Sequence, residues 1–221
     1  MRVSLDLGNP RLARSAAGPR SRAPIRLFKS DRLERLTRTS VTATIAFWLP
    51  ISSGAIVFGL VRWRLPSMAV LGLLGAGAAA WMLVEYLLHR FVFHLDRWLP
   101  EAARFCFVIH GCHHADPDDA SRSIMPLSGS VPMMGLVLLC LVSGLGVAGG
   151  LVFFGTFALS YLAYDVTHYG CHQWSLPGRL GAYIQRHHLT HHYLDGARHF
   201  GVTSPLLDRV FGTLRLDTRR G

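Results

Sequence analysis

The sequence QRHHLTHH, residues 185–192, places four histidines within six positions near the end of this 221-residue chain. Three earlier segments, residues 89–94, 110–114 and 168–172, each hold two or three more, so that eleven of the twelve histidines fall in four segments. Neutral imidazole is the commonest metal ligand among side chains, and it suits iron, zinc, copper and nickel. The sequence therefore predicts a scaffold for a polyhistidine metal centre.

Two of these segments carry histidine triplets with the same spacing. In residues 110–114, and again in residues 188–192, the histidines stand at positions i, i+3 and i+4, which share one face of an α-helix. Three ligands on one face within a turn can serve two adjacent metal ions. His187 points about 100° away from His188, so we expect it at the surface or behind the ligands. We also expect His199 behind the ligands.

The other two segments carry histidine pairs at the ends of apolar runs. His168 and His172 stand four residues apart, and Asp165 lies one turn before His168. We expect this carboxylate to accept an imidazole N–H, which fixes the tautomer of a metal ligand. His89 and His94 stand five residues apart, about 140° around a regular α-helix. For both to face one centre, that helix must loosen, carry a π-bulge or end there.

The number of histidines indicates two ions. Ten imidazoles are too many for one ion, whereas two ions would receive about five each and keep a position open for substrate or dioxygen. Structural zinc is normally tetrahedral and closed, so this nitrogen-rich, incompletely filled site favours redox iron, with zinc as a substitute in a purified sample. Cys112 and Cys171 are expected to be small packed residues, not thiolate ligands. The predicted ligands are His89, His94, His110, His113, His114, His168, His172, His188, His191 and His192.

The rest of the composition is typical of a membrane-embedded, all-α protein. Half of the residues are hydrophobic and 16% are charged, and uncharged runs cover residues 39–61, 65–84 and 123–164. About 20 apolar residues cross a bilayer, so the first two runs predict one span each and the third predicts two, joined by a turn at residues 146–150. The absence of a polar stripe disfavours the alternative, a hairpin buried in a large soluble core. The predicted spans are residues 41–61, 66–88, 131–147 and 150–167, with a helical cap from residues 89–130 and 168–221.

The basic residues are concentrated before the first predicted span. Residues 1–38 hold ten Arg or Lys against three acidic residues, which predicts that this end stays cytoplasmic. With four spans, the C-terminus and the histidine segments lie on the same side. A nucleic-acid-binding tail or an organellar transit peptide is a less favoured interpretation, and no nucleic-acid partner is expected. We expect residues 1–38 to be partly disordered or interfacial, and residues 39–221 to form the membrane domain.

The bias toward arginine suggests an origin for the chain. Of its 23 basic residues only Lys29 is a lysine, which we associate with a GC-rich bacterial genome. The predicted location is therefore a bacterial inner membrane.

The order of the four motifs, HxxxxH, HxxHH, HxxxH and HxxHH, resembles the integral-membrane fatty acid hydroxylase superfamily, which includes sterol desaturases and carotene hydroxylases. Fatty acid 2-hydroxylases look most similar, on the strength of residues 110–122, 164–172, 188–193 and 200–213. The resemblance implies a four-span fold with a cytosolic cap, a diiron centre and dioxygen-dependent hydroxylation next to the carbonyl of a long acyl chain. His199 stands where the family pattern leads us to expect Asn, and Leu207 where it leads us to expect Trp. Both departures bear on head-group specificity more than on metal binding.

Such an oxygenase needs electrons, and the sequence holds no recognisable carrier. Neither the His-Pro-Gly-Gly haem motif of cytochrome b5 nor a Gly-rich dinucleotide fingerprint is present. We therefore expect an external donor of the cytochrome b5 or ferredoxin type.

Two rival functions remain open. A carotenoid or sterol hydroxylase or desaturase would use the same metals on another membrane lipid. A metal transporter is less favoured, because transporters place polar ligands near the bilayer midplane, whereas these histidines gather at one predicted membrane edge.

Overall fold

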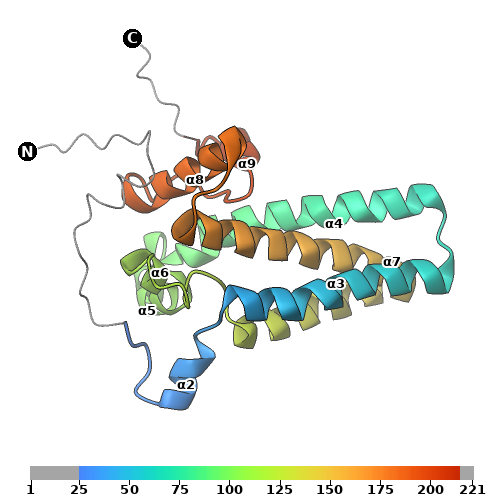
Figure 1. Cartoon of the computed structure of the whole chain (residues 1–221), viewed down its shortest axis with the longest axis horizontal. Coiled ribbons are helices and arrows are strands. Elements are labelled where there is room, and N and C mark those ends of the chain that lie inside the picture. Colours follow the sequence, from blue (N-terminus) through green and yellow to red (C-terminus); the bar gives the residue numbers. More distant parts are fainter. Residues whose placement is uncertain (1–24, 215–221) are drawn as a thin grey trace, which may run out of the picture.

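The computed structural model describes residues 25–214, and every regular element in that range is helical (Figure 1). The predicted all-α class is therefore confirmed for the described part of the chain. Residues 1–24, most of the predicted basic N-terminal segment, lie outside the described residues. The long helices are α3 (Val41–Trp63), α4 (Ser67–Leu87), α7 (Leu127–Gln173) and α8 (Gly178–Tyr193). The short ones are α2 (Asp31–Leu36), α5 (Ala103–Cys106), α6 (Cys112–Ala115), α9 (Leu206–Val210), the π-helices η1 (Leu88–Phe93) and η4 (Phe107–Gly111), and the 3₁₀ turns η2 (Leu95–Arg97) and η3 (Pro100–Ala102).

Three helical stretches in the described residues are long and apolar enough to cross a membrane: Val41–Trp63, Ser67–Phe93 and Leu127–Gln173. The first begins at an ordinary cap, where the Ser40 side chain accepts a hydrogen bond from the Ala43 N–H. Large apolar side chains point outward, and Val61 and Met68 are 74% and 78% exposed. Outward apolar side chains suit a lipid solvent, so the first two predicted spans, 41–61 and 66–88, correspond to α3 and to α4 with η1.

The third stretch, α7, is interrupted at Gly146, whose φ of 71° and ψ of 169° are not helical. A Cβ added at Gly150 would lie 2.7 Å from the Cα atom of Val142, so the backbones before and after the break run close together. Figure 1 shows the yellow-green first part and the orange second part extending along the same long axis. The predicted turn at residues 146–150 thus coincides with the observed break, while the count of four membrane crossings stays a prediction.

Glycines let α7 approach both neighbouring helices closely. A Cβ at Gly155 of α7 would lie 2.6 Å from the Ser52 carbonyl oxygen of α3, and a Cβ at Gly77 of α4 would lie 2.7 Å from the Phe153 carbonyl oxygen of α7. Small residues at such contacts allow backbones to pack without an intervening side chain. The spans are therefore held in one packed bundle in which α7 contacts α3 and α4.

We expect Gly77→Ala to lower the stability of the folded chain by about 1–3 kcal/mol, because the new methyl group overpacks against backbone atoms. The matched control is Gly75→Ala, two residues earlier on the same helix, where an added Cβ meets nothing within 4 Å. Thermal unfolding of the purified protein in detergent measures both variants. Equal melting temperatures for the two variants would contradict the close contact.

The cap helices gather at one end of the bundle. In Figure 1, α5, α6, α8 and α9 all lie where α3 begins and α4 ends. Below this end, Trp81 packs edge-on against Phe157 and Tyr161 with ring centroids 5.3 and 5.1 Å apart. This aromatic cluster forms part of the buried core. It belongs to α4 and α7 and precedes His89 and His168 by about two to three helical turns.

Candidate metal centre

The fold brings ten histidines into two groups of five. In each group every residue offers one ring nitrogen, and these nitrogens all lie within 4.8 Å of one another. The first histidine group consists of His89, His94, His110, His114 and His191. The second histidine group consists of His113, His168, His172, His188 and His192. These are the ten residues expected from the sequence, and they divide as five and five.

A π-helix solves the spacing problem of the first pair. The α4 helix continues directly into η1, and His94 follows its last residue with φ −113° and ψ 33°. Hydrogen bonds from i to i+5 in a π-helix bring residues five apart to one side. The rings of His89 and His94 are stacked, with centroids 5.3 Å apart. The sequence left three alternatives open: a loosened helix, a π-bulge or a helix end. The structure shows the last two together, because a π-helix is formed and helical geometry ends at His94.

The triplets are divided between the two groups. His110 and His114 are four residues apart and join the first group, with Nε2 atoms 2.9 Å apart, whereas His113 joins the second. Residues 100–115 form a series of short helices, of which η4 is again a π-helix. The series ends at Ala115, and Asp116 is no longer helical, with φ −142° and ψ 76°.

The second triplet is divided in the opposite sense. His188 and His192 on α8 join the second group, while His191 joins the first. Its Nε2 atom lies 3.0 Å from that of His89, 3.1 Å from that of His94 and 3.2 Å from that of His114. Each group therefore combines one pair from a long helix, two residues of one triplet and one residue of the other.

The nitrogen spacing fits metal coordination. Two imidazole nitrogens about 2.1 Å from one ion and at a right angle to each other are about 3.0 Å apart, close to the separations around His191. In the second group the Nε2 atoms of His172 and His188 are 2.8 Å apart. Both ring nitrogens of His113 and of His192 are buried without a hydrogen-bond partner within residues 25–214. Buried polar atoms without partners require an explanation, and a bound cation supplies one.

The electrostatics keep these rings neutral. Burial, with smaller contributions from His114 and Arg97, lowers the pKa of His94 to about 3. Burial and then Arg97 lower the pKa of His114 to about 4. For His113 and His191, burial and neighbouring imidazoles hold the pKa well below the usual value. Neutral rings offer lone pairs at neutral pH, as metal binding requires.

His187 and His199 lie outside both groups. His187 is 5% exposed, so the surface position is wrong and the position behind the ligands is the observed one. Its Nε2 atom lies 3.0 Å from Oδ2 of Asp208, and its Nδ1 atom lies 2.8 Å from Nδ1 of His199. The sequence assigned no role to Asp208, although this residue lies in residues 200–213, one of the stretches on which the family resemblance rests.

The expected hydrogen bond from His168 to Asp165 does not form. His168 bonds to the backbone of Ser123, which leaves no N–H for the carboxylate. Asp165 is 1% exposed. Tyr161 and the Met125 backbone interact with it, yet neither carboxylate oxygen has a hydrogen bond of normal geometry in the described part of the chain. Asp165 instead lines a cavity beside the histidines.

That cavity has a volume of about 450 Å³ and joins the metal centre to the bundle. His110 of the first group and His113 of the second group both line it, and its walls are mainly apolar, with Trp81 and Met133 toward the spans. A concave, apolar site with few polar groups is the usual form of a ligand pocket. Its lining places apolar side chains of the bundle and members of both histidine groups around one space.

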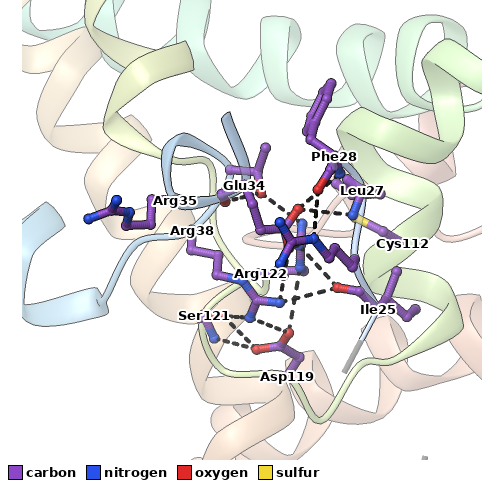
Figure 2. A network of polar contacts seen from close by, with 12 residues as sticks. Ile25, Leu27, Phe28, Glu34, Arg35, Arg38, Cys112, Asp119, Ser121 and Arg122 are labelled. Atoms are coloured by element: carbon purple, nitrogen blue, oxygen red, sulfur yellow. Dashed lines mark hydrogen bonds and ion pairs between the residues drawn. The ribbon is translucent and has the colours of Figure 1, made fainter. Parts of the chain in front are cut away.

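The segment around α2 closes one side of the cavity through Phe28, Leu33 and Leu36. Figure 2 shows the polar network that holds this segment. The buried guanidinium of Arg122 bonds to the Glu34 carboxylate, and Arg122 Nη2 also donates to the Ile25 carbonyl oxygen at 3.2 Å.

Glu34 is held from its other side by its own segment. Its Oε2 atom accepts hydrogen bonds from the N–H groups of Leu27 and Phe28 at 3.0 and 3.1 Å. Arg38 completes the network by reaching both Glu34 and Asp119. No sequence signal connected positions 34 and 122, which are 88 residues apart.

Residues 74–213 match the family model described as fatty acid hydroxylase. The chain belongs to the fatty acid hydroxylase family. Family membership, the two histidine groups and the three apolar helices agree with the resemblance seen in the sequence.

Curated relatives of this family member come from fungi, plants and mammals. It is 36% identical to a ceramide very long chain fatty acid hydroxylase of Schizosaccharomyces pombe, over 82% of this chain and 52% of that protein. It is 34% identical to a dihydroceramide fatty acyl 2-hydroxylase of Arabidopsis thaliana, over 86% of this chain and 79% of that protein. The chain is also 35% identical to the human fatty acid 2-hydroxylase, over 86% of this chain and 57% of that protein. The chain spans about half the length of the S. pombe protein and somewhat more of the human one.

A solved structure has the same fold. It is full-length scs7p, in which only the hydroxylase domain is visible. It superimposes with a TM-score of 0.77 at 33% identity, covering 83% of this chain and 70% of that one.

Proposed function

We propose that this protein is a membrane-bound, dioxygen-dependent monooxygenase that hydroxylates carbon 2 of a long-chain fatty acyl group at a diiron centre. The observation that carries the proposal is the junction of two five-histidine groups with one apolar cavity, in a chain of the fatty acid hydroxylase family. Relatives described as fatty acyl 2-hydroxylases support the position of the new hydroxyl group.

The two histidine groups are the proposed metal ligands. Their donor set is entirely nitrogen, which suits iron, and zinc is the expected substitute in purified protein. Two iron ions held there would supply the dioxygen chemistry that hydroxylation of an unactivated C–H bond requires. The chain's own contribution is to converge the nitrogens of the ten rings at the end of an apolar cavity, where burial keeps rings such as His113 and His191 neutral.

The cavity favours an acyl chain as substrate. Trp81 and Met133 are among its apolar lining residues, and Asp165, His110, His113 and His168 are among its polar ones. The alkyl portion of the substrate would bind among the apolar side chains, which offer surroundings as apolar as the lipid tails that it leaves. An oxygen of Asp165 can accept a hydrogen bond from an amide N–H or a hydroxyl of the head group.

The membrane arrangement follows from the same proposal. The protein would cross the membrane four times, and α7 would supply two of these crossings, one before and one after Gly146. This arrangement would place the cap and its histidines on the cytoplasmic side, where the basic N-terminal segment is also expected. Reducing equivalents would come from a donor of the cytochrome b5 or ferredoxin type. Origin in a bacterial inner membrane stays a prediction from the arginine bias.

Lipid analysis tests the reaction. We expect cells that express the protein to accumulate 2-hydroxy acyl chains, measured by mass spectrometry after hydrolysis of total lipids, and we expect ¹⁸O from labelled dioxygen in the new hydroxyl group. Hydroxylated sterols or carotenoids without 2-hydroxy acyl chains would instead favour the rival reaction of the superfamily. Unchanged lipids alongside metal uptake into the cells would favour a transporter.

A further inference from the structure

Two residues of the first histidine group are oriented by the backbone of one short loop, residues 198–201. Nδ1 of His191 lies 2.7 Å from the Arg198 carbonyl oxygen, and Nδ1 of His89 lies 2.6 Å from the Phe200 carbonyl oxygen. A carbonyl oxygen only accepts, so each ring carries its proton on Nδ1 and presents the lone pair of Nε2 to the group. The position of this loop therefore decides where two of the five donor atoms lie.

The loop is held by the carboxylate of Asp208, which is fully buried. Its Oδ1 atom accepts from the Phe200 N–H and the Thr213 hydroxyl, at 2.8 and 2.7 Å. Its Oδ2 atom accepts from the Gly201 N–H at 2.8 Å and from Nε2 of His187 at 3.0 Å. Four donors on two oxygens require an ionised carboxylate, which is an acceptor only. Burial alone would raise the pKa of Asp208, but the bonds from His187, Thr213 and the loop outweigh it and the pKa lies below its usual value.

The two histidines outside the groups extend this clamp. His187 donates from Nε2 to Asp208, and its Nδ1 atom lies 2.8 Å from Nδ1 of His199, so that one of these two facing nitrogens donates to the other. The His199 backbone has a φ of 62°, a left-handed conformation that is uncommon for residues other than glycine. Its N–H bonds to the Thr213 carbonyl oxygen at 3.1 Å. Backbone and side-chain bonds together thus hold His199, and with it the carbonyls on either side.

The hydrogen bonds described for the second histidine group do not involve this loop: His168 bonds to the Ser123 backbone, and Nε2 of His172 faces Nε2 of His188. Nδ1 of His188, and both ring nitrogens of His113 and of His192, have no hydrogen-bond partner there. Of the two histidine groups, only the first receives hydrogen bonds to the backbone carbonyls of residues 198–201 in the bonds described above. Loss of the clamp should therefore affect one group and spare the other.

We propose that Asp208 is a positioning residue which, with His187 and His199, sets the metal affinity of the first histidine group selectively, by fixing the two carbonyls that orient His89 and His191. This inference rests on the proposed metal-binding function of the two groups. It adds to that function a difference between the two ions: the clamp sets the affinity for the ion of the first histidine group and not for that of the second.

The test measures metal binding by the full-length chain, purified in detergent and stripped of metal. Zinc is titrated against a chromophoric chelator, and bound metal is counted by mass spectrometry. Wild-type protein is expected to bind two ions tightly. Asp208→Asn replaces one carboxylate oxygen, with its two acceptor positions, by an NH₂ group that donates. We expect the affinity for one ion to fall by about 10–100-fold, the usual effect of losing a group that orients a ligand, and the affinity for the other ion to stay unchanged. Asp195→Asn is the matched control, because Asp195 neighbours the same loop, and its partly exposed carboxylate bonds to the Arg198 side chain and the Ala197 N–H and not to Asp208 or His187.

A second variant covers the possibility that Asp208→Asn folds poorly. His187→Phe keeps a buried ring and removes one of the four bonds to Asp208, so a smaller loss, up to about 10-fold, is expected at the same ion. Equal weakening of both ions, or two unchanged ions in both variants with helical circular dichroism intact, would overturn the positioning role and leave the proposed function standing. Wild-type protein that binds no ion would overturn both.

Discussion

Replacement of His191 by alanine is expected to lower product formation by on the order of 10³-fold or more, because a metal ion contributes several kcal/mol to the stabilisation of a transition state. His191 is the residue of choice because its Nε2 atom lies within 3.2 Å of ring nitrogens from three other members of the first histidine group. The measurement is the yield of 2-hydroxy acyl chains by mass spectrometry, at matched amounts of membrane-inserted protein. The metal content of the purified variant should fall from two ions to one.

Thr190→Ala is the matched control on the same helix. Thr190 precedes His191, and its hydroxyl donates only to the Arg186 carbonyl oxygen one turn earlier, at 2.8 Å. We expect near wild-type product and two bound ions for this variant. A His191→Ala protein that retained both ions and full product would remove the first histidine group from the reaction.

Replacement of Arg122 by alanine is expected to lower the stability of the folded chain by about 3 kcal/mol, since breaking a buried ion pair leaves an uncompensated charge. Glu34 and Arg122 are 8% and 6% exposed. Two backbone N–H groups and Arg38 would remain around Glu34, which places the loss at the low end of the range for buried pairs. An apparent melting temperature lower by about 6–12 °C in detergent is the expected reading for a domain of this size.

Arg26→Ala tests whether burial is the reason. Arg26 pairs with Asp31 in the same segment, but their side chains are 51% and 78% exposed, and an exposed pair contributes at most about 1 kcal/mol. We expect a small shift in melting temperature for this control. If both variants shifted equally, the network of Figure 2 would not be the element that holds the α2 segment against the cavity.

Much of the centre was predictable from local sequence. The spacing i, i+4 brings two imidazoles to one face of a helix wherever that helix lies, which is why His110 with His114, and His188 with His192, stay together. The five-residue spacing of His89 and His94 required an irregular helix, and η1 has that form. The apolar runs likewise indicated the long helices, with the break of α7 at Gly146 inside the predicted turn.

The hydrogen-bond partners were not predictable in the same way. Asp165 is one turn from His168, and sequence proximity suggested a bond that the packing of Ser123 against His168 prevents. Asp208 reaches His187 across 21 residues, and Arg122 reaches Glu34 across 88. In each case the partner depends on how separate elements pack, because a side-chain hydrogen bond extends only about 3 Å.

The sequence by itself therefore identified the ten clustered histidines and the apolar helices that carry or flank them, since composition and helical periodicity are local properties of the chain. Only the tertiary structure decided how the ten divide. His191 lies in the first group with His89, 102 residues away in the sequence, and not with His188 and His192. His113 likewise lies in the second group, apart from His110 and His114. The division arises because His191 lies about 60° from His188 and 100° from His192 around α8, so that it faces His89 beyond the end of α4, while His188 faces His172 at the end of α7.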